Sequence, residues 1–222
     1  MAEWHDTTEE YLEVILSLEE DGVRPMRARL VERLGLSAAA VSETVARLAD
    51  HGFLRVREDR TLELTPKGRK LATTIVRRHR LAVRLRADVI GLEWEKVHRE
   101  AARWEHVISA EVEEKLVELL GDPATCPHGN PIPGTHRKAR AEATVTLDGA
   151  PAGLVTVSRI SERLELDEES LEFVASARLI PGATATVLAN VDGSHDGVMV
   201  RTANGEYSVP PKIAEQLHVA TG

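Results

Sequence analysis

The chain has 222 residues, long enough for more than one domain, and the composition of an ordinary soluble protein. No apolar run reaches the roughly 18–20 residues that span a bilayer, and the N-terminus is acidic where a signal peptide is basic, so we expect a cytoplasmic protein without a membrane partner. The net charge of −8 excludes a protein that coats nucleic acid non-specifically, and the single cysteine, Cys126, excludes an internal disulfide.

The N-terminal residues predict three helices. Asp6 and Thr7 can cap a first helix, whose apolar positions follow the 3.6-residue period until Gly22 ends it. A second helix is expected from Arg27 to Leu34, and Ser37 can cap a third. Because a short glycine-containing turn joins the second helix to the third, the pair is expected to form a helix-turn-helix.

A β-hairpin is expected after the third helix. The runs FLRVRE and TLELT alternate apolar and polar residues in period two around Asp59 and Arg60. The sequence therefore predicts a winged helix-turn-helix DNA-binding domain over residues 1–73. Because the net charge is negative, DNA binding needs a local cationic surface and a dimer that doubles it.

The next segment predicts a helical domain. The Thr-Pro pair at residues 65–66 opens a long helix that Gly91 ends. Another helix is expected from about Glu95 to Ile108, and Ser109 can cap one more. These helices are apolar on more than the face that a small winged domain covers, which is typical of a dimerisation module. We assign it to residues 74–140, whose proline- and glycine-rich end is a tether.

Residues 141–222 predict a small β-rich domain. Short runs of β-forming residues are separated by turn dipeptides such as Asp148-Gly149 and Asn204-Gly205. One helix is expected from about Asp167 to Ser176. The pattern is that of a small β-barrel. The predicted fold class is thus α+β and multidomain, with a winged helix-turn-helix, an all-α dimerisation domain and a C-terminal β-barrel.

A stripe of residues after Gly91 indicates a metal site. His98, Ala102, Glu105 and His106 fall on one face of the expected helix. Imidazole and carboxylate groups are metal ligands, and no pattern in the chain pairs a nucleophile with a positioned base. Because the stripe follows a predicted DNA-binding domain, we expect a metal-gated transcription factor and not an enzyme with an organic substrate.

Eight segments of the first 135 residues carry a family resemblance: DTTEEYL, RARLVERL, SETVARL, LTPKGRKLA, RRHRLA, DVIGLEWEKVH, RWEHVIS and GNPIPG. Through them the chain resembles the DtxR/IdeR family of metal-dependent repressors. The resemblance implies a homodimeric repressor of metal-homeostasis genes, in which divalent iron or manganese is bound where the DNA-binding and dimerisation domains meet. In the last eighty residues only the order of strands matches, and it implies an SH3-like (FeoA-like) barrel.

The resemblance assigns Glu105 and His106 to the family's primary activating site. Iron-sensing members have a methionine at the position of Glu10 and a cysteine at that of Ala102. Manganese-sensing relatives have a carboxylate at the position of Glu10 and another one turn later, here Glu13. They have a glutamate at the position of Ala102, which here offers only its backbone carbonyl. Glu13 is either a ligand or part of a solvated helix face.

The altered ligands bear on the choice of metal. Oxygen ligands in place of a thioether and a thiol favour a harder ion, so we expect Mn²⁺ over Fe²⁺. Zn²⁺ also binds such sites, and its presence in a purified sample would not identify the physiological ion. Without metal, Glu10, Glu13 and Glu105 are expected to repel one another, and a divalent cation would neutralise them and hold the two domains together.

The same resemblance implies a secondary metal site. His79 and His98 match ancillary-site ligands of iron-sensing members, although Val83 replaces a glutamate that helps to form their site. Several manganese-responsive relatives use the cysteine and histidine of a CPHG segment, here Cys126 and His128. A carboxylate from the C-terminal domain, such as Asp167 or Glu168, is expected to complete this site. Arg80 and Asn130 match positions that hold an anion beside the ancillary metal in iron-sensing members.

The predicted recognition helix presents its first turns to base edges, through Ser37, Ala38, Ala39, Ala40, Ser42 and Glu43. Iron-sensing relatives have at the position of Glu43 a glutamine, which prefers adenine, whereas a carboxylate accepts a hydrogen bond from cytosine. The operator is then expected to differ from theirs. Alternatively, Glu43 faces solvent or pairs with a neighbouring arginine. Phosphate contacts are expected from Arg27, Arg29 and Arg60.

Two other functions stay open at this point. One is a winged-helix regulator that senses redox state or a small molecule, with Cys126 as the sensor and the metal residues only structural. The other is a metal-trafficking or adaptor protein, because SH3-like domains also occur in ferrous transport proteins. The predicted DNA-binding domain disfavours the second alternative.

Overall fold

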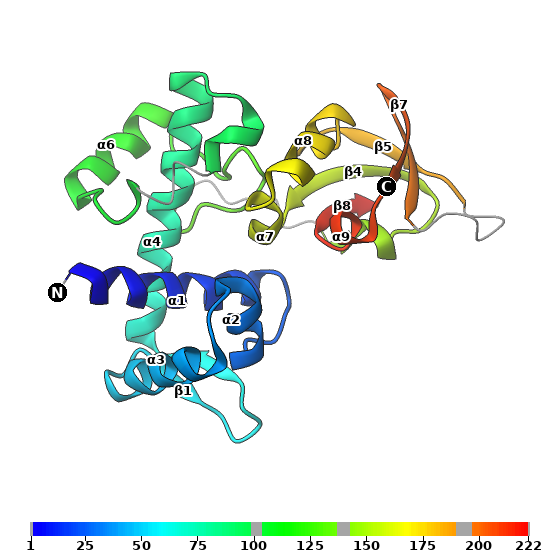
Figure 1. The fold of residues 1–222 in the computed structure, drawn as a ribbon. Coiled ribbons are helices and arrows are strands. Elements are labelled where there is room, and N and C mark those ends of the chain that lie inside the picture. The colour runs from blue at the N-terminus through cyan, green and yellow to red at the C-terminus, as the bar shows by residue number, and fades with distance from the viewer. Residues whose placement is uncertain (1, 99–103, 137–142, 190–196, 222) are drawn as a thin grey trace. The chain divides into compact units, whose positions relative to one another are not determined.

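A computed structural model describes residues 2–98, 104–136, 143–189 and 197–221, and the side chains from residue 7 onward (Figure 1). The chain divides into two compact units. The first comprises Met1–His79 and Glu105–Val107, and the second comprises Arg80–Trp104 and Ile108–Gly222. Among the described residues, no helix combines the length and the apolar character needed to cross a membrane.

The first unit contains the predicted helix-turn-helix and wing. Its elements are α1 (Ala2–Glu20), α2 (Arg27–Leu34), α3 (Ala38–Asp50), β1 (Leu54–Val56), β2 (Leu62–Leu64) and the beginning of α4 (Pro66–Leu85). The expectation that Asp6 and Thr7 cap the first helix is wrong, because α1 begins at Ala2 and both residues lie within it. Residues 2–6 include alanine and glutamate, which favour helix, and no glycine or proline there interrupts it.

Local hydrogen bonds explain how these elements begin and end. Gly35 ends α2 in the left-handed conformation, and the Ser37 hydroxyl accepts a hydrogen bond from the Ala40 N–H at 3.2 Å, as predicted for the cap of α3. At the tip of the hairpin Arg60 has a φ of 67°, and the Asp59 carboxylate accepts from the Thr61 N–H at 3.0 Å. These local bonds fix the recognition helix and the wing.

One apolar core holds the first unit together. Its largest fully buried members come from α1, α2, α3 and both strands, namely Tyr11, Leu12, Ile15, Leu18, Leu30, Leu48, Leu54 and Leu62. Because α1 contributes four of them, its orientation within the unit is set by packing against the helix-turn-helix. The polar face of α1 remains for other contacts.

The second unit begins with the remainder of α4. This helix passes into a π-helical turn, Arg86–Ile90, that Gly91 ends in the left-handed conformation, as expected for its terminus. A 3₁₀ turn, Trp94–Lys96, follows, and α6 (Ala110–Leu120) is capped by Ser109, whose hydroxyl accepts from Val112 N–H at 3.3 Å. Both cap predictions are confirmed.

The helix expected from about Glu95 to Ile108 is only partly correct. Residues 99–103 lie outside the described residues, and helical structure ends at Trp104. Glu105, His106 and Val107 form a turn, because the chain must change direction before α6 begins. Two residues of the predicted helical stripe therefore lie beyond the helix.

The C-terminal part of the second unit is an antiparallel six-stranded sheet with the strand order β3-β8-β4-β5-β6-β7. The strands are β3 (Thr144–Thr146), β4 (Gly153–Ile160), β5 (Thr184–Val187), β6 (Val198–Thr202), β7 (Gly205–Val209) and β8 (Leu217–Thr221). A 3₁₀ turn, Leu147–Gly149, precedes β4. The α+β class and the order of a winged helix-turn-helix, a helical segment and an antiparallel β domain are confirmed.

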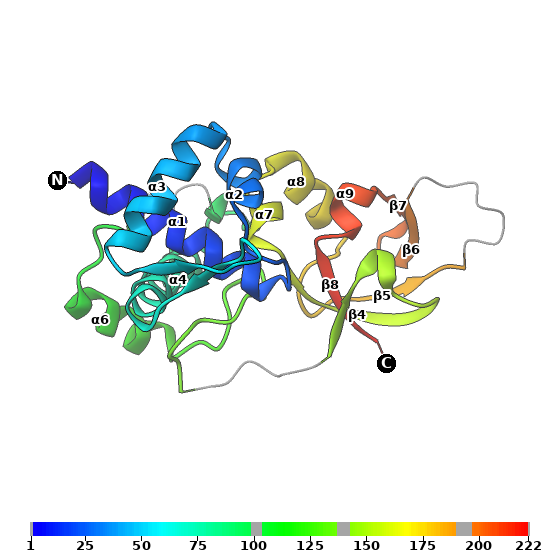
Figure 2. The same cartoon turned by 90° about the horizontal axis from the view of Figure 1, so that it is seen from below.

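Three short helices accompany the sheet, and only one of them was expected. The predicted one is α8 (Glu168–Ser176), which Asp167 caps, and Leu171 and Val174 place it against the core of the sheet (Figure 2). The others are α7 (Glu162–Glu165) and α9 (Pro211–Ala214), which are too short to show a helical period. Helix α7 matters most, because it directly follows β4 and carries Glu165.

Candidate metal centres

Carboxylates and imidazoles gather at one place in the first unit. Helix α1 supplies Glu9 and Glu13, α4 supplies His79, and the turn before α6 supplies Glu105 and His106. One ligand atom from each of Glu13, His79 and Glu105 lies within 4.8 Å of the other two. We call these five residues the first cluster.

Every ion pair within the first cluster joins an imidazole to a carboxylate. Glu105 Oε2 accepts from His79 Nδ1, and both side chains are about 4% exposed. On the other ring, His106 Nδ1 lies 2.7 Å from Glu9 Oε2 and His106 Nε2 lies 3.4 Å from Glu105 Oε1. Of the three carboxylates that were expected to repel one another, Glu105 thus has a histidine partner from another segment of the chain.

Glu10 lies near the first cluster and is exposed. Burial of part of the side chain raises the pKa of Glu10, the charge of His106 lowers it, and the charge of Glu105 raises it. The Glu10 carboxylate therefore interacts electrostatically with both predicted ligands, His106 and Glu105. Glu13 is the α1 residue whose carboxylate lies within 4.8 Å of ligand atoms of His79 and Glu105. Ala102 lies outside the described residues.

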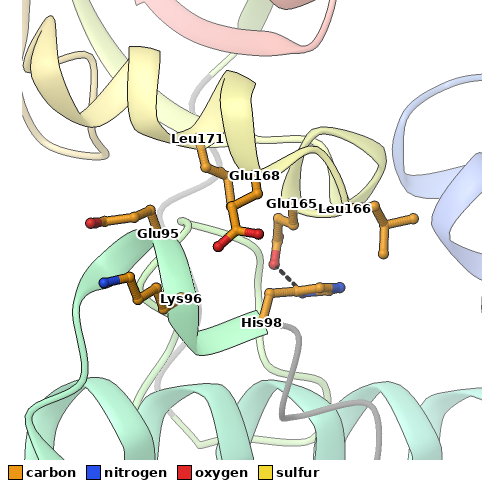
Figure 3. Close-up of a pocket in the computed structure, with 7 residues that line it drawn as sticks. All are labelled: Glu95, Lys96, His98, Glu165, Leu166, Glu168 and Leu171. Atoms are coloured by element: carbon orange, nitrogen blue, oxygen red, sulfur yellow. Dashed lines mark hydrogen bonds and ion pairs between the residues drawn. The ribbon is translucent and has the colours of Figure 1, made fainter.

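A second group lies within the second unit. Cys126, His128 and Glu165 place one ligand atom each within 4.8 Å of the other two, and all three residues are buried. His98 joins them, because its Nδ1 lies 2.8 Å from Glu165 Oε2 (Figure 3). We call these four residues the second cluster. His98, Cys126 and His128, which were expected to share a site, all lie in the second cluster. His79 lies with Glu13 and Glu105 in the first unit, and its expected role in the secondary site stays a prediction.

The loop that carries Cys126 and His128 is held against β4. Gly129 has a φ of +87°, and a Cβ at this position would come within 2.2 Å of the Ser158 carbonyl oxygen, so only glycine allows this approach. The Ile160 N–H donates to the His128 carbonyl at 3.0 Å. The backbone therefore places His128 beside the end of β4, one short turn before Glu165.

Both nitrogens of His128 have a defined environment. Nε2 lies 3.2 Å from the Trp94 carbonyl oxygen and can donate to it. Nδ1 is buried and lies 2.9 Å from Glu165 Oε2. The imidazole and the carboxylate thus converge at the place where the Cys126 thiol and His98 also lie. Four donors of this kind, one of them a thiol, fit a divalent transition metal.

The charges of the second cluster depend on one another. Burial by itself lowers the pKa of His128, but Glu165 and then Cys126 raise it to about 10. Burial by itself raises the pKa of Glu165, but His128 and His98 outweigh this effect and hold it well below its ordinary value. The carboxylate is therefore negative and available to a cation.

The closing carboxylate in the structure is Glu165, which the sequence analysis missed. Asp167 instead caps α8, where its carboxylate accepts from Ser170 N–H at 3.2 Å and from Ser170 Oγ at 2.7 Å. Glu168 lines a cavity of about 110 Å³ together with His98 and Glu165, and its side chain points toward the segment that carries His98 (Figure 3). The ELDEE run showed that a carboxylate was near, but not which one.

Arg80 and Asn130 have structural hydrogen bonds. Arg80 Nη1 donates to the Pro131 carbonyl at 2.6 Å. Asn130 Nδ2 donates to the Ile160 carbonyl at 2.9 Å and to Glu165 Oε1 at 2.7 Å. Asn130 thus orients the Glu165 carboxylate, a role that the sequence did not reveal, and the anion site stays a prediction.

The expected DNA-reading residues lie on one face of α3. Val41, Thr44, Val45 and Leu48 are buried, whereas an exposed face comprises Ser37, Ala38, Ala39, Ala40, Ser42 and Glu43. The wing residue Arg60 is exposed, and Arg27 is half-buried. Arg29 is exposed and pairs with Glu32 at 2.7 Å, a bond at the surface that phosphate can replace.

Two family models match the chain. Residues 3–62 match the N-terminal DNA binding domain of the iron dependent repressors, and residues 65–134 match their metal binding and dimerisation domain. The chain is 48% identical to the iron-dependent repressor IdeR of Mycobacterium tuberculosis over 99% of both chains. It is 42% identical to the diphtheria toxin repressor of Corynebacterium diphtheriae over 86% of this chain and 90% of that protein.

Solved structures give a similar result. A manganese-dependent transcriptional repressor in complex with manganese superposes with a TM-score of 0.83 at 29% identity, covering 97% of this chain and all of the other. The iron-dependent relatives by sequence and the manganese-dependent relative by structure agree on a metal-dependent repressor.

The choice between neighbouring carboxylates can be tested with two matched variants. Glu165→Gln is expected to weaken Co²⁺ binding at the second cluster by at least about 100-fold. Loss of a group that only orients a ligand costs about 10–100-fold, and Glu165 is proposed to be a ligand itself. Asp167→Asn is expected to leave binding unchanged, since asparagine caps a helix as well as aspartate. The readout is the absorption that the Cys126 thiolate gives when it binds cobalt. Equal loss in both variants would contradict the assignment.

Proposed function

The chain belongs to the DtxR/IdeR family of metal-dependent transcriptional repressors, and we propose that Mn²⁺, in preference to Fe²⁺, switches its binding to operator DNA. The observation that carries the proposal is the first cluster. Its members are three carboxylates and two imidazoles, and the positions where iron-sensing members have methionine and cysteine are Glu10 and Ala102 here. A donor set of oxygen and nitrogen favours a harder ion than one that contains sulfur.

Glu13, His79, Glu105 and His106 would hold the activating ion, with Glu10 at its edge. When bound, the ion would supply the positive charge that balances the carboxylates of the cluster. Glu13 would then link α1 to Glu105, and the packing of α1 against the helix-turn-helix would pass this constraint to α3. To act as a sharp switch, the ion must favour the DNA-competent state by about 5 kcal/mol.

The second cluster would hold a further ion through His98, Cys126, His128 and Glu165. Such an ion would tie the loop at residues 126–130 to the C-terminal sheet. Because thiolate and imidazole suit Zn²⁺ as well as Mn²⁺ or Fe²⁺, zinc is expected to occupy this cluster in vitro. Cys126 is 3% exposed and belongs to this donor set, which disfavours a separate role as a redox sensor.

The partners follow from the family's two domains, one that binds DNA and one that dimerises. In the second unit several large apolar side chains stay exposed, at Val89, Ile90, Leu92, Val112 and Leu119. We propose that a second copy covers them, and that the chain has a DNA-binding domain over 1–73, a dimerisation domain over 74–140 and an SH3-like domain over 141–222. The recognition helix would insert its exposed face, which includes Ser42 and Glu43, into the major groove.

The proposal is tested by binding of the protein to its own promoter region in the presence of Mn²⁺, Fe²⁺ under anaerobic conditions, Zn²⁺ or a chelator. We expect chelator to abolish specific binding and Mn²⁺ to restore it at a lower free concentration than Fe²⁺. Half-saturation by Fe²⁺ at the lower concentration would overturn the metal preference, and binding that ignores chelator would overturn metal gating itself.

The activating site is tested by the double variant Glu105→Ala/His106→Ala. It is expected to lose metal-dependent DNA binding and to remain a dimer in analytical ultracentrifugation, because the exposed apolar residues are unchanged. A matched control removes an exposed glutamate and an exposed histidine of the second unit, Glu172→Ala/His136→Ala, and should bind like the wild type. Metal-dependent binding that survives in the first variant would mean that the site lies elsewhere.

Base reading by Glu43 is tested with Glu43→Gln and Glu43→Ala. If the carboxylate accepts from cytosine, Glu43→Gln should move the preference at one operator position toward adenine by about 1–3 kcal/mol, and Glu43→Ala should relax it. The measurement is selection from a library of randomised operators with Mn²⁺ present. If both variants select the wild-type operator, Glu43 faces solvent.

A further inference from the structure

Glu9 is the member of the first cluster that sequence reasoning did not identify. Its Oε2 lies 2.7 Å from His106 Nδ1, and the two side chains are 16% and 23% exposed. The other nitrogen of the same ring, Nε2, is the one that faces Glu105 Oε1, at 3.4 Å. The two edges of the His106 ring therefore have different partners.

This arrangement determines where the ring carries its proton. A neutral imidazole has one N–H, and a carboxylate, which only accepts, favours that proton on the nitrogen nearest to it. Glu9 Oε2 lies at 2.7 Å from Nδ1, a normal hydrogen-bond distance, whereas Glu105 Oε1 lies 3.4 Å from Nε2, so the proton is favoured on Nδ1 and the lone pair on Nε2. A carboxylate beside Nδ1–H also increases the basicity of Nε2.

We propose that Glu9 is a positioning residue, which acts on the activating ion through His106 and does not bind the ion itself. The inference rests on the proposed function of the first cluster. Glu13, one helical turn after Glu9 on α1, meets His79 and Glu105 directly. Helix α1 therefore contributes two carboxylates with different roles. Glu13 would bind the ion, and Glu9 accepts a hydrogen bond from Nδ1 of His106, on the side of the ring away from the ion.

The pairing has a second consequence for α1. The contact joins α1 to the turn that carries His106 through two protein side chains, and it leaves Nε2 available to a ligand. Because the contact restricts rotation of the His106 ring, less conformational entropy is lost when the ring binds an ion. Loss of Glu9 should weaken metal binding even though the set of direct ligands is intact.

The test compares Glu9→Gln with Glu9→Ala. The glutamine oxygen can still accept from Nδ1–H, whereas alanine cannot. In metal-free protein with ¹⁵N-labelled histidine rings, measured where the His106 ring is neutral, the wild type and Glu9→Gln should show the Nδ1–H tautomer. Glu9→Ala should show a mixture of tautomers. This readout does not depend on DNA or metal, so it can fail while the proposed function stands.

Metal affinity supplies the second readout. Mn²⁺ binding at the first cluster should weaken by about 10–100-fold in Glu9→Ala and by much less in Glu9→Gln. Equal loss in both variants would show that Glu9 is a direct ligand, because an amide is a poor replacement for a coordinating carboxylate. An unchanged His106 tautomer in Glu9→Ala would equally overturn the proposal. Should Glu9→Ala not fold, the tautomer and affinity of Glu9→Gln still decide between the two roles.

Discussion

The structure depends on the pairing of buried carboxylates with imidazoles from distant parts of the chain. A carboxylate removed from water without a cation or a hydrogen-bond donor costs several kcal/mol, so Glu105 and Glu165 are stable in their positions only with such partners. His79 pairs with Glu105, and His98 and His128 pair with Glu165. Each pairing joins segments that would otherwise have no reason to lie together.

The same pairings make both clusters responsive to metal. Imidazole nitrogens and carboxylate oxygens are also the donor atoms that divalent transition metals bind. The side chains that pair with one another in each cluster are therefore the ones that could share an ion. In the first cluster Glu13 lies on a helix whose opposite face, with Tyr11 and Ile15, is part of the core of the DNA-binding unit. A change at the cluster acts on a helix that is rigidly packed against the recognition helix.

The two clusters differ in chemical softness. The first contains oxygen and nitrogen donors, whereas the second adds the Cys126 thiol in a fully buried position. Hard and soft donor sets discriminate differently among first-row ions, so one chain can hold two ions with different exchange behaviour.

Local sequence determined the elements and the kind of chemistry. Capping by Ser37 and Ser109 and the period of the helices depend on neighbours within one turn, so they could be predicted. The family resemblance added the repressor function and the assignment of the candidate ligands to two sites. The acid-rich run after β4 indicated a carboxylate for the second site without specifying it.

Only the tertiary structure decided how the ligands are shared. It placed His79 with Glu13 and Glu105, selected Glu165 instead of Asp167, and set Glu9 behind His106. None of these outcomes has a local signal, because a ligand set is defined by which distant segments meet, and that is decided by core packing and by the approach of Gly129 to β4. The sequence by itself determined that this protein binds a metal and DNA; the fold determined which atoms face the ion.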